Sequence, residues 1–260
     1  MRHLIMSDIH GRYDELMLAL GNARYDETSD RLIVLGDVID RGRQSRQVLE
    51  YLAGLVARGR DIELVRGNHE DLVQAFLEGR IGALKHWLYT CQGVSLLWSY
   101  GFNHNRLKFA GDRVWADGAE IMTRDDARAF LLAFVPGEHL SVIEGMRRYR
   151  LVIPRALWNH DLFCCHAGLV HNTRTRETPQ WLFCWGDPAW QNGRSADYQP
   201  ITVYGHFHQP IGPLVRYRRV CLAVEGAVAV LIPEEQVIVT SDGDCIEVRP
   251  ERLLTGQDLV

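Results

Sequence analysis

The sequence predicts an α/β fold of four layers, in which two mixed sheets pack face to face between outer helices. Strand-like and helix-like segments alternate three times before residue 78, which is typical of largely parallel strands. From residue 150 onward short strand-like segments dominate, and the last of them have the close spacing of an antiparallel meander. A chain of 260 residues can bury roughly three quarters of its unfolded surface in one core. We therefore expect a single domain over residues 1–260.

The individual elements follow from the spacing of apolar residues. Three short apolar runs are expected to be strands buried on both faces, at residues 4–6, 32–35 and 62–65. A segment with helical spacing follows each of them, at residues 13–22, 47–57 and 71–77. The later strands are expected at residues 150–153, 162–165, 201–204, 214–216, 220–224, 228–232, 236–240 and 245–248.

Residues 79–150 differ from the rest of the chain and are expected to form a helical cap insert. Aromatic-rich helical stretches, separated by glycine-containing turns, cover residues 87–100, 124–134 and 138–147. The aromatic side chains from Trp87 to Phe102 suit either a nucleobase pocket or core packing. Core packing is the favoured interpretation, because the burial of aromatic rings is so favourable.

The composition argues against several classes of protein. With 29 Lys and Arg against 33 Asp and Glu, the net charge of -4 gives no whole-chain attraction to nucleic acid or to a membrane surface. The apolar start, Met1 to Ser7, is too short for a signal peptide or a membrane span. The six cysteines show no C-x-x-C spacing, so neither a zinc knuckle nor a redox dithiol is indicated. We expect a cytoplasmic protein with reduced cysteines, and nothing in the chain identifies a partner protein.

Acidic and histidine-bearing segments follow the first three predicted strands directly. They read SDIHG at residues 7–11, GDVIDRG at 36–42 and RGNHE at 66–70. Since ligands in open α/β sheets bind outside the carboxyl ends of the strands, we expect these segments to gather there. Their carboxylate, imidazole and amide oxygen groups suit divalent ions such as Mn, Fe or Zn.

Two later segments complete the set. CCHAGL at residues 164–169 and GHFH at residues 205–208 each follow a predicted strand. Five of the eleven histidines thus lie at strand ends beside small residues. A lone histidine is more often a surface or core residue, but five of them with three aspartates and an asparagine in matching context indicate a metal site.

These motifs resemble those of the calcineurin-like metallophosphoesterases and, among them, of the bacterial protein serine/threonine phosphatases. The family's markers are GDxHG, GDxxDRG, GNHE, HAGL or HGGL after a strand, and a late GH. Here they correspond to SDIHG, GDVIDRG, GNHE, HAGL and GHFH, in order, across residues 7–208. The segment GVSLLWSYG at residues 93–101 is similar to one found in bacterial members. The resemblance implies the family's four-layer α/β/β/α sandwich.

The resemblance also implies two divalent metal ions per chain, with Mn expected and Fe or Zn as alternatives. Bound together, such ions hold the phosphate oxygens and generate the hydroxide that attacks phosphorus directly. A carboxylate suits the bridging position because it offers one oxygen to each ion. The implied ligands are Asp8 and His10 for the first ion, Asn68, His166 and His206 for the second, and Asp37 bridging both.

His69 is not expected to bind metal. It resembles the family's general acid, which protonates the leaving alkoxide, and Asp40 would hold its imidazole in the protonated form. Arginine suits the positions that grip phosphate, because its planar fork makes bidentate contacts that lysine cannot. The implied substrate-binding residues are Arg41, Arg66, Asn68 and Arg194.

Two positions depart from the phosphatase pattern. Ser7 stands where the opening motif usually has glycine, but serine is small and should disturb the turn little. His208 follows the wider superfamily's GHxH pattern, in which the second histidine binds the first ion, whereas the protein phosphatases usually have only the first histidine. His208 is thus either a further ligand residue, the seventh of the set, or a neighbour in the cleft, and we favour the ligand.

The lead hypothesis is a phosphatase that hydrolyses phosphomonoesters of the phosphoserine or phosphothreonine type. The first alternative is a hydrolase of diadenosine tetraphosphate or a related dinucleoside polyphosphate, since such enzymes share these motifs. A catalytically silent metal-binding interaction protein is the alternative from another class, and the retention of His69 and Asp40 beside all six ligands argues against it. The expected partner is thus a phosphorylated substrate, either a phosphoprotein or a small phosphoester or nucleotide.

Overall fold

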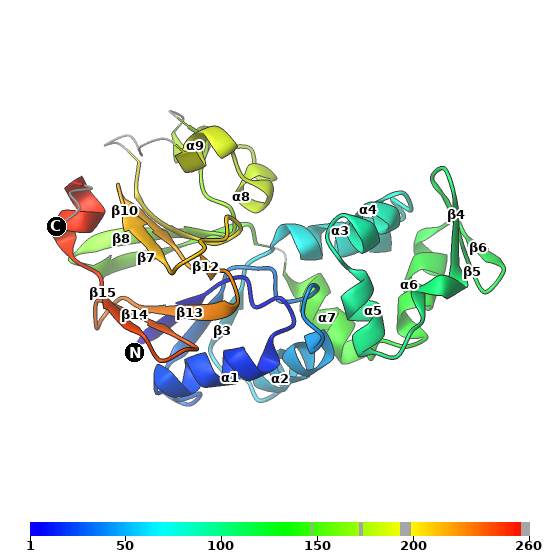
Figure 1. The fold of residues 1–260 in the computed structure, drawn as a ribbon, viewed down its shortest axis with the longest axis horizontal. Helices are drawn as coiled ribbons and strands as arrows, with labels where there is room; N and C mark the ends of the chain where they lie inside the picture. The colour runs from blue at the N-terminus through cyan, green and yellow to red at the C-terminus, as the bar shows by residue number, and fades with distance from the viewer. Residues whose placement is uncertain (147, 172–173, 193–198, 256–260) are drawn as a thin grey trace.

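Two sheets lie face to face between outer helices in the computed structural model of the protein (Figure 1). The structure describes residues 1–146, 148–171, 174–192 and 199–255. The predicted four-layer α/β sandwich is confirmed. Among the described residues, no helix is both long and apolar enough to cross a lipid bilayer.

The first sheet has seven strands and contains the parallel start of the chain. Its strand order is β15-β14-β13-β1-β2-β3, with β12 paired to β13. The three N-terminal strands are parallel to one another, whereas β13 runs antiparallel to β1. The strand bounds are β1 His3–Met6, β2 Arg31–Val34, β3 Ile62–Leu64, β12 Ala223–Val224, β13 Ala227–Ile232, β14 Val237–Thr240 and β15 Cys245–Glu247.

The second sheet has five strands in the order β10-β11-β9-β8-β7. Its centre is parallel, since β9 pairs in parallel with both β8 and β11, while β7 and β10 are antiparallel edges. The bounds are β7 Arg150–Leu157, β8 His160–Cys165, β9 Ile201–Tyr204, β10 Leu214–Arg216 and β11 Arg219–Cys221.

Side chains alternate between the two faces of the first sheet and so join three layers. Along β1, Leu4 and Met6 pack with the outer helices, whereas Ile5 packs into the core between the sheets. On β13, Leu231 is the register partner of Ile5 and lies in the same inter-sheet core. This alternation is the period of two that a strand imposes on its side chains.

Helices cover both outer faces (Figure 1). The helices α1 and α2 lie against the first sheet, and their buried leucines join its apolar cluster. The short helices α8 and α9 lie over the second sheet, where Phe183 and Trp190 pack against Tyr204. The bounds are α1 Tyr13–Asn22, α2 Ser45–Ala57, α3 Asn68–Leu77, α8 Leu182–Trp185 and α9 Pro188–Asn192.

The insert is not wholly helical, which differs from the expectation. It holds the helices α4 Ala83–Tyr89, α5 Val94–Ser99, α6 Arg124–Leu132 and α7 Gly137–Gly145. It also holds a three-stranded sheet made of β4 Leu107–Ala110, β5 Arg113–Ala116 and β6 Ala119–Ile121. Asp117 and Gly118 join β5 to β6 with positive φ angles of 50° and 86°, as a tight hairpin of type I′ requires. The helix expected over 87–100 is divided at Gln92, whose φ is also positive.

The inter-sheet core should dominate stability. Leu231→Ala leaves a cavity at a fully buried position and is expected to lower the free energy of unfolding by about 2–5 kcal/mol. Urea unfolding followed by circular dichroism measures the change. As a control, Leu18→Ala on α1, where the side chain is 56% exposed, is expected to change it by no more than about 0.5 kcal/mol. Equal effects of the two changes would contradict this account of the core.

Candidate active site

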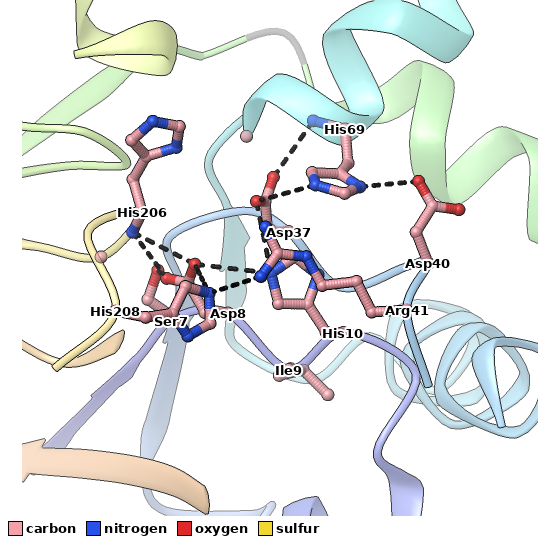
Figure 2. Close-up of polar contacts among 12 residues, drawn as sticks. Ser7, Asp8, Ile9, His10, Asp37, Asp40, Arg41, His69, His206 and His208 are labelled. Carbon is pink, nitrogen blue, oxygen red and sulfur yellow. Dashed lines mark hydrogen bonds and ion pairs between the residues drawn. The ribbon is translucent and has the colours of Figure 1, made fainter. Parts of the chain in front are cut away.

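Residues predicted from the sequence meet on the loops that follow β1, β2, β3 and β9 (Figure 2). A fifth loop, after β8, brings His166 Nε2 to 3.3 Å from Asp37 Oδ2. Backbone hydrogen bonds join the first two loops, since the amides of Asp8 and His10 donate to the carbonyls of Gly36 and Asp37 at 3.1 and 2.8 Å. The backbone amide of His206 donates to both carboxylate oxygens of Asp8 at 3.1 and 2.9 Å. Residues nearly 200 positions apart thus become neighbours.

Several of the predicted site residues have strained backbones. Asp8, His10, Asp37, Asp40 and His206 have φ angles of 55°, 47°, 53°, 72° and 62°. The left-handed region is uncommon for residues other than glycine, and each occurrence costs on the order of 1–3 kcal/mol. Such strain persists where the surrounding structure fixes it, and it concentrates at functional sites. Its gathering on these residues is independent support for a working site.

Ligand-type atoms converge in three overlapping groups among the described residues, one of which joins His10 and Asp37 to His69, the expected proton donor. The other two hold residues expected to bind metal. One combines Asp8, His10 and His208, and another combines Asp37, His166 and His206; within each group the ligand atoms lie within 4.8 Å of one another. The Nε2 atom of His208 is 3.6 Å from Asp8 Oδ1.

Asn68 joins the second group through its side-chain oxygen. Asn68 Oδ1 is 3.2 Å from His166 Nε2 and 3.0 Å from His206 Nδ1. The structure thus brings together all seven residues expected to bind the two ions: Asp8, His10, Asp37, Asn68, His166, His206 and His208.

Two histidines are oriented by a backbone carbonyl behind the ring, so that Nε2 faces the centre. The Nδ1 atoms of His10 and His166 lie 3.1 and 2.7 Å from the carbonyls of Ile39 and Leu35, so each Nδ1 must carry the donated proton. His10 Nε2 is buried, has no hydrogen-bond partner among the described residues, and lies 3.7 Å from Asp8 Oδ1 and 3.6 Å from Asp37 Oδ2. A buried lone pair between two carboxylates fits a cation, and a carbonyl behind the ring is the usual support of a metal-binding histidine.

The protonation states of His10 and His206 agree with this fit, whereas at His166 the charge of Asp37 outweighs burial and raises the pKa to about 9. Burial holds the pKa of His10 well below its usual value, although the charge of Asp37 opposes the shift. Burial and the neighbouring His166 lower the pKa of His206 to about 4. Both imidazoles are therefore neutral near pH 7, which is the form that binds metal.

The pKa of His69 is shifted in the opposite direction from those of His10 and His206. Its Nδ1 atom donates to Asp40 Oδ2 at 2.7 Å, and its Nε2 atom faces Asp37 Oδ2 at 3.6 Å (Figure 2). Burial disfavours the charged ring, but the attraction of Asp37 and the hydrogen bond to Asp40 outweigh it and raise the pKa of His69 to about 9. The ring is thus protonated near neutral pH and presents an N–H toward the centre of the site.

Three residues that support the site were not predicted to belong to it. The buried side chain of Glu70 accepts hydrogen bonds from the backbone amides of Asp37, Val38 and Gly67, which fixes the second loop on the start of α3. Ser7 donates to Asp8 Oδ2 at 2.5 Å. Trp87, interpreted as core, is fully buried and also donates from Nε1 to Asp40 Oδ2 at 2.8 Å. The only sequence signal for Glu70 was its place at the end of GNHE.

The expected phosphate-binding arginines differ in their surroundings. Arg41 is exposed, and its Nη1 lies 3.1 Å from His208 Nε2 at the edge of the site. Arg66 points elsewhere: its guanidinium nitrogens donate to Met146, Asp71, Tyr149 and Gln74. Arg194 lies outside the described residues.

A small pocket adjoins the site. It has a volume of about 240 Å³, and its lining residues are His10, Arg12, Arg41, Gly42, His208, Glu225 and Gly226. Arg12 donates from Nε and Nη2 to the carbonyls of Ile9 and Asp8, at 3.1 and 2.8 Å. Its Nη1 atom has no partner among the residues that the structure describes.

Comparison with known proteins places the chain in a family. The sequence model of the calcineurin-like phosphoesterase family matches residues 1–228. The chain belongs to this family. Two groups of its aspartates and histidines fit the dinuclear divalent metal site that this family's fold implies.

The curated relatives match only part of the chain. Symmetrical bis(5'-nucleosyl)-tetraphosphatases of Hamiltonella defensa and of Klebsiella pneumoniae strain 342 are each 39% identical over 70 residues. That stretch is 27% of this chain and 24% of either relative, so the match spans about a quarter of the curated proteins.

Solved structures match over nearly the whole chain. A candidate diadenosine tetraphosphatase has a TM-score of 0.58 at 16% identity, with 92% of each chain covered. The cold-active protein-tyrosine phosphatase of a Shewanella species has a TM-score of 0.56 at 15% identity, and a protein serine/threonine phosphatase of Saccharomyces cerevisiae has 0.51 at 14%. Each of these two matches covers 95% of this chain and 80% of the other. At such identities the likeness shows the fold alone.

The close packing behind the first group of ligands predicts an effect on metal binding. A Cβ atom at Gly205 would overlap Asp8 Oδ2 and Ser7 Oγ. Gly205→Ala is therefore expected to weaken Mn²⁺ binding by about tenfold or more, as lost support of a ligand does. Isothermal titration calorimetry measures the change, with Gly212→Ala, whose added Cβ meets nothing within 4 Å, as the control. Unchanged binding in both variants would contradict the role of Asp8 as a ligand.

Proposed function

We propose that this phosphoesterase hydrolyses phosphomonoesters of aliphatic alcohols, of the phosphoserine and phosphothreonine type. The observation that carries the proposal is the His69–Asp40 pair, which holds a proton beside the two groups of ligands. An alkoxide is a poor leaving group, because its conjugate acid ionises far above neutral pH. A positioned acid therefore contributes most to hydrolysis of this type of ester.

Each residue has a defined part in the proposed reaction. Asp8, His10, Asp37 and His208 would hold one ion, and Asn68, His166 and His206 would hold the other together with Asp37. When bound, the ions supply Lewis acidity and a nucleophile from water near neutral pH. Oxygen and imidazole donors without thiolate suit Mn²⁺, the metal we propose, and also Fe or Zn.

The protein's own groups complete the reaction. As the bond from phosphorus to the leaving oxygen breaks, its electron pair stays on that oxygen, which takes the proton from His69 Nε2. The Nδ1–H group of His69 keeps its hydrogen bond to Asp40 throughout, so the ring ends neutral and correctly oriented. Arg41, exposed at the edge of the site beside His208, is placed to grip phosphate oxygens with its fork. For Arg66 we propose a supporting part, because its donors are already engaged within the protein.

A second candidate substrate is a dinucleoside polyphosphate. The pocket beside His10 and His208 favours it, because Arg12 and Arg41 supply two positive charges there against the one negative charge of Glu225. Those charges suit the further phosphates that a polyphosphate chain carries past the reacting one. The names of the partial relatives point in the same direction.

The leaving group makes the two candidates chemically distinct. A departing nucleoside diphosphate has a terminal phosphate with a pKa of about 6, so it leaves without needing a proton. An alkoxide, by contrast, needs a proton in order to leave. His69 therefore matters for one class of substrate far more than for the other.

His69→Asn tests the acid. Its kcat on a phosphoserine peptide is expected to fall by on the order of a hundredfold or more, since general acids contribute about 10²–10⁴-fold. Metal content, measured by plasma mass spectrometry, should stay at two ions per chain in this variant. Loss of metal from the variant would instead show that His69 is a ligand.

The choice between substrates is tested by comparing kcat/KM for a phosphoserine peptide with kcat/KM for diadenosine tetraphosphate, both with Mn²⁺. We expect the peptide to be preferred by the wild-type protein. A strong preference for the dinucleotide would replace the proposal by the second candidate. Failure to hydrolyse para-nitrophenyl phosphate with any divalent metal would favour the metal-binding protein without turnover.

Arg12→Gln removes a charge from the pocket beside His10 and so tests which of the two candidate substrates the protein uses. If the polyphosphate is the substrate, losing this charge should raise KM for diadenosine tetraphosphate about tenfold or more, as expected for one charge-assisted contact. KM for para-nitrophenyl phosphate, which carries a single phosphate, should change little. Arg24→Gln, at an exposed arginine on the loop after α1, is the control.

A further inference from the structure

Trp87 connects the insert to the proton-donating pair. It lies on α4 with a fully buried side chain, and its Nε1 atom donates to Asp40 Oδ2 at 2.8 Å. The same oxygen accepts the hydrogen bond from His69 Nδ1 at 2.7 Å, whereas Asp40 Oδ1 has no partner among the described residues. One carboxylate oxygen therefore receives two donors, one from α3 and one from the insert.

This arrangement limits the motion of the carboxylate. Asp40 is fully buried and cannot turn toward water, and rotating its carboxylate would break both hydrogen bonds at once. Hydrogen bonds to a charged acceptor are the strong ones, and they strengthen further where water is excluded. The indole N–H thus restrains the oxygen that in turn orients the His69 ring.

The insert holds the indole itself in place. Gly93, just before α5, approaches the Trp87 ring so closely that an added Cβ atom would overlap Trp87 Nε1. The backbone φ of Gly93 is -62°, an ordinary value for any residue, so the glycine serves the close approach. The segment 93–101, with no role so far, thereby contributes to the position of the indole.

We propose that Trp87 is a positioning residue for proton donation, through which the insert sets the orientation of Asp40 and hence of His69. The inference rests on the proposed function of His69 as the general acid. A Trp87 that served only as core packing would affect stability alone. A positioning role predicts a loss that grows as the leaving group becomes harder to expel.

Trp87→Phe removes the N–H and keeps an aromatic ring. We expect kcat to fall about tenfold for an alkyl phosphate, part of the about 10²–10⁴-fold contributed by general acids. The fall for para-nitrophenyl phosphate, whose leaving group needs little protonation, should be several times smaller. Trp190→Phe is the matched control, because Trp190 is also fully buried and donates to Gln199 Oε1 at 3.2 Å over the second sheet. Trp190→Phe should leave the ratio of kcat for the alkyl phosphate to kcat for para-nitrophenyl phosphate unchanged.

Gly93→Ala gives an independent test that keeps the tryptophan. The added Cβ must displace the indole N–H from Asp40, so this variant should show the same selective loss on the alkyl phosphate. Gly145→Ala, in the same insert, places its Cβ where nothing lies within 4 Å and is the control. Thermal unfolding and metal content, measured for all four variants, separate global damage from positioning.

The outcomes are distinguishable. Equal loss on both substrates in Trp87→Phe, or in Gly93→Ala if the first variant does not fold, overturns the inference while leaving the proposed function intact. If His69→Asn also lowers both rates equally, the acid has been misassigned and the proposed function fails with it. Selective loss in His69→Asn, Trp87→Phe and Gly93→Ala, absent from both controls, supports the proposal.

Discussion

The buried carboxylate of Asp37 is the constraint around which the site is arranged. Its Oδ1 atom accepts the amide of His69, and its Oδ2 atom faces the Nε2 atoms of His10, His69 and His166 at 3.6, 3.6 and 3.3 Å. A buried charge is costly unless it is paired and hydrogen-bonded. Loops from four separate strand ends are drawn together because each supplies part of that compensation. Gly67 permits the approach, since a Cβ there would overlap Asp37 itself.

Two buried histidines beside this carboxylate acquire opposite protonation states from the groups behind them. The rings of His10 and His69 are 4.8 Å apart between centroids. His10 donates from Nδ1 to a neutral carbonyl, so burial prevails and its pKa falls. His69 donates to a carboxylate, so the charged form prevails and its pKa rises. The same side chain thus suits a metal ligand in one place and a proton donor in the other.

The sequence predicted the sandwich and the five loops because both depend on local signals: apolar runs of strand length, and polar motifs directly after them. The sequence could not predict contacts between residues that lie far apart along the chain. Nothing local indicates that Trp87 reaches Asp40, 47 residues earlier, or that Arg66 turns toward Met146. The hairpins of the insert were missed for another reason. Their strands are only three or four residues long, and the Asp117-Gly118 turn was the one strong signal among them.

The contact between Trp87 and Asp40 bears on how such a scaffold accommodates new substrates. An insert between shared motifs is the segment in which related enzymes can differ while the ligand loops stay fixed. In this protein the insert also holds one of the two hydrogen bonds on the oxygen that orients His69. A rearrangement that reshapes the insert for a larger substrate therefore also changes the restraint on the proton donor. With His69 as the general acid that we propose, a substrate that leaves without a proton tolerates such a change better than an alkyl phosphate does.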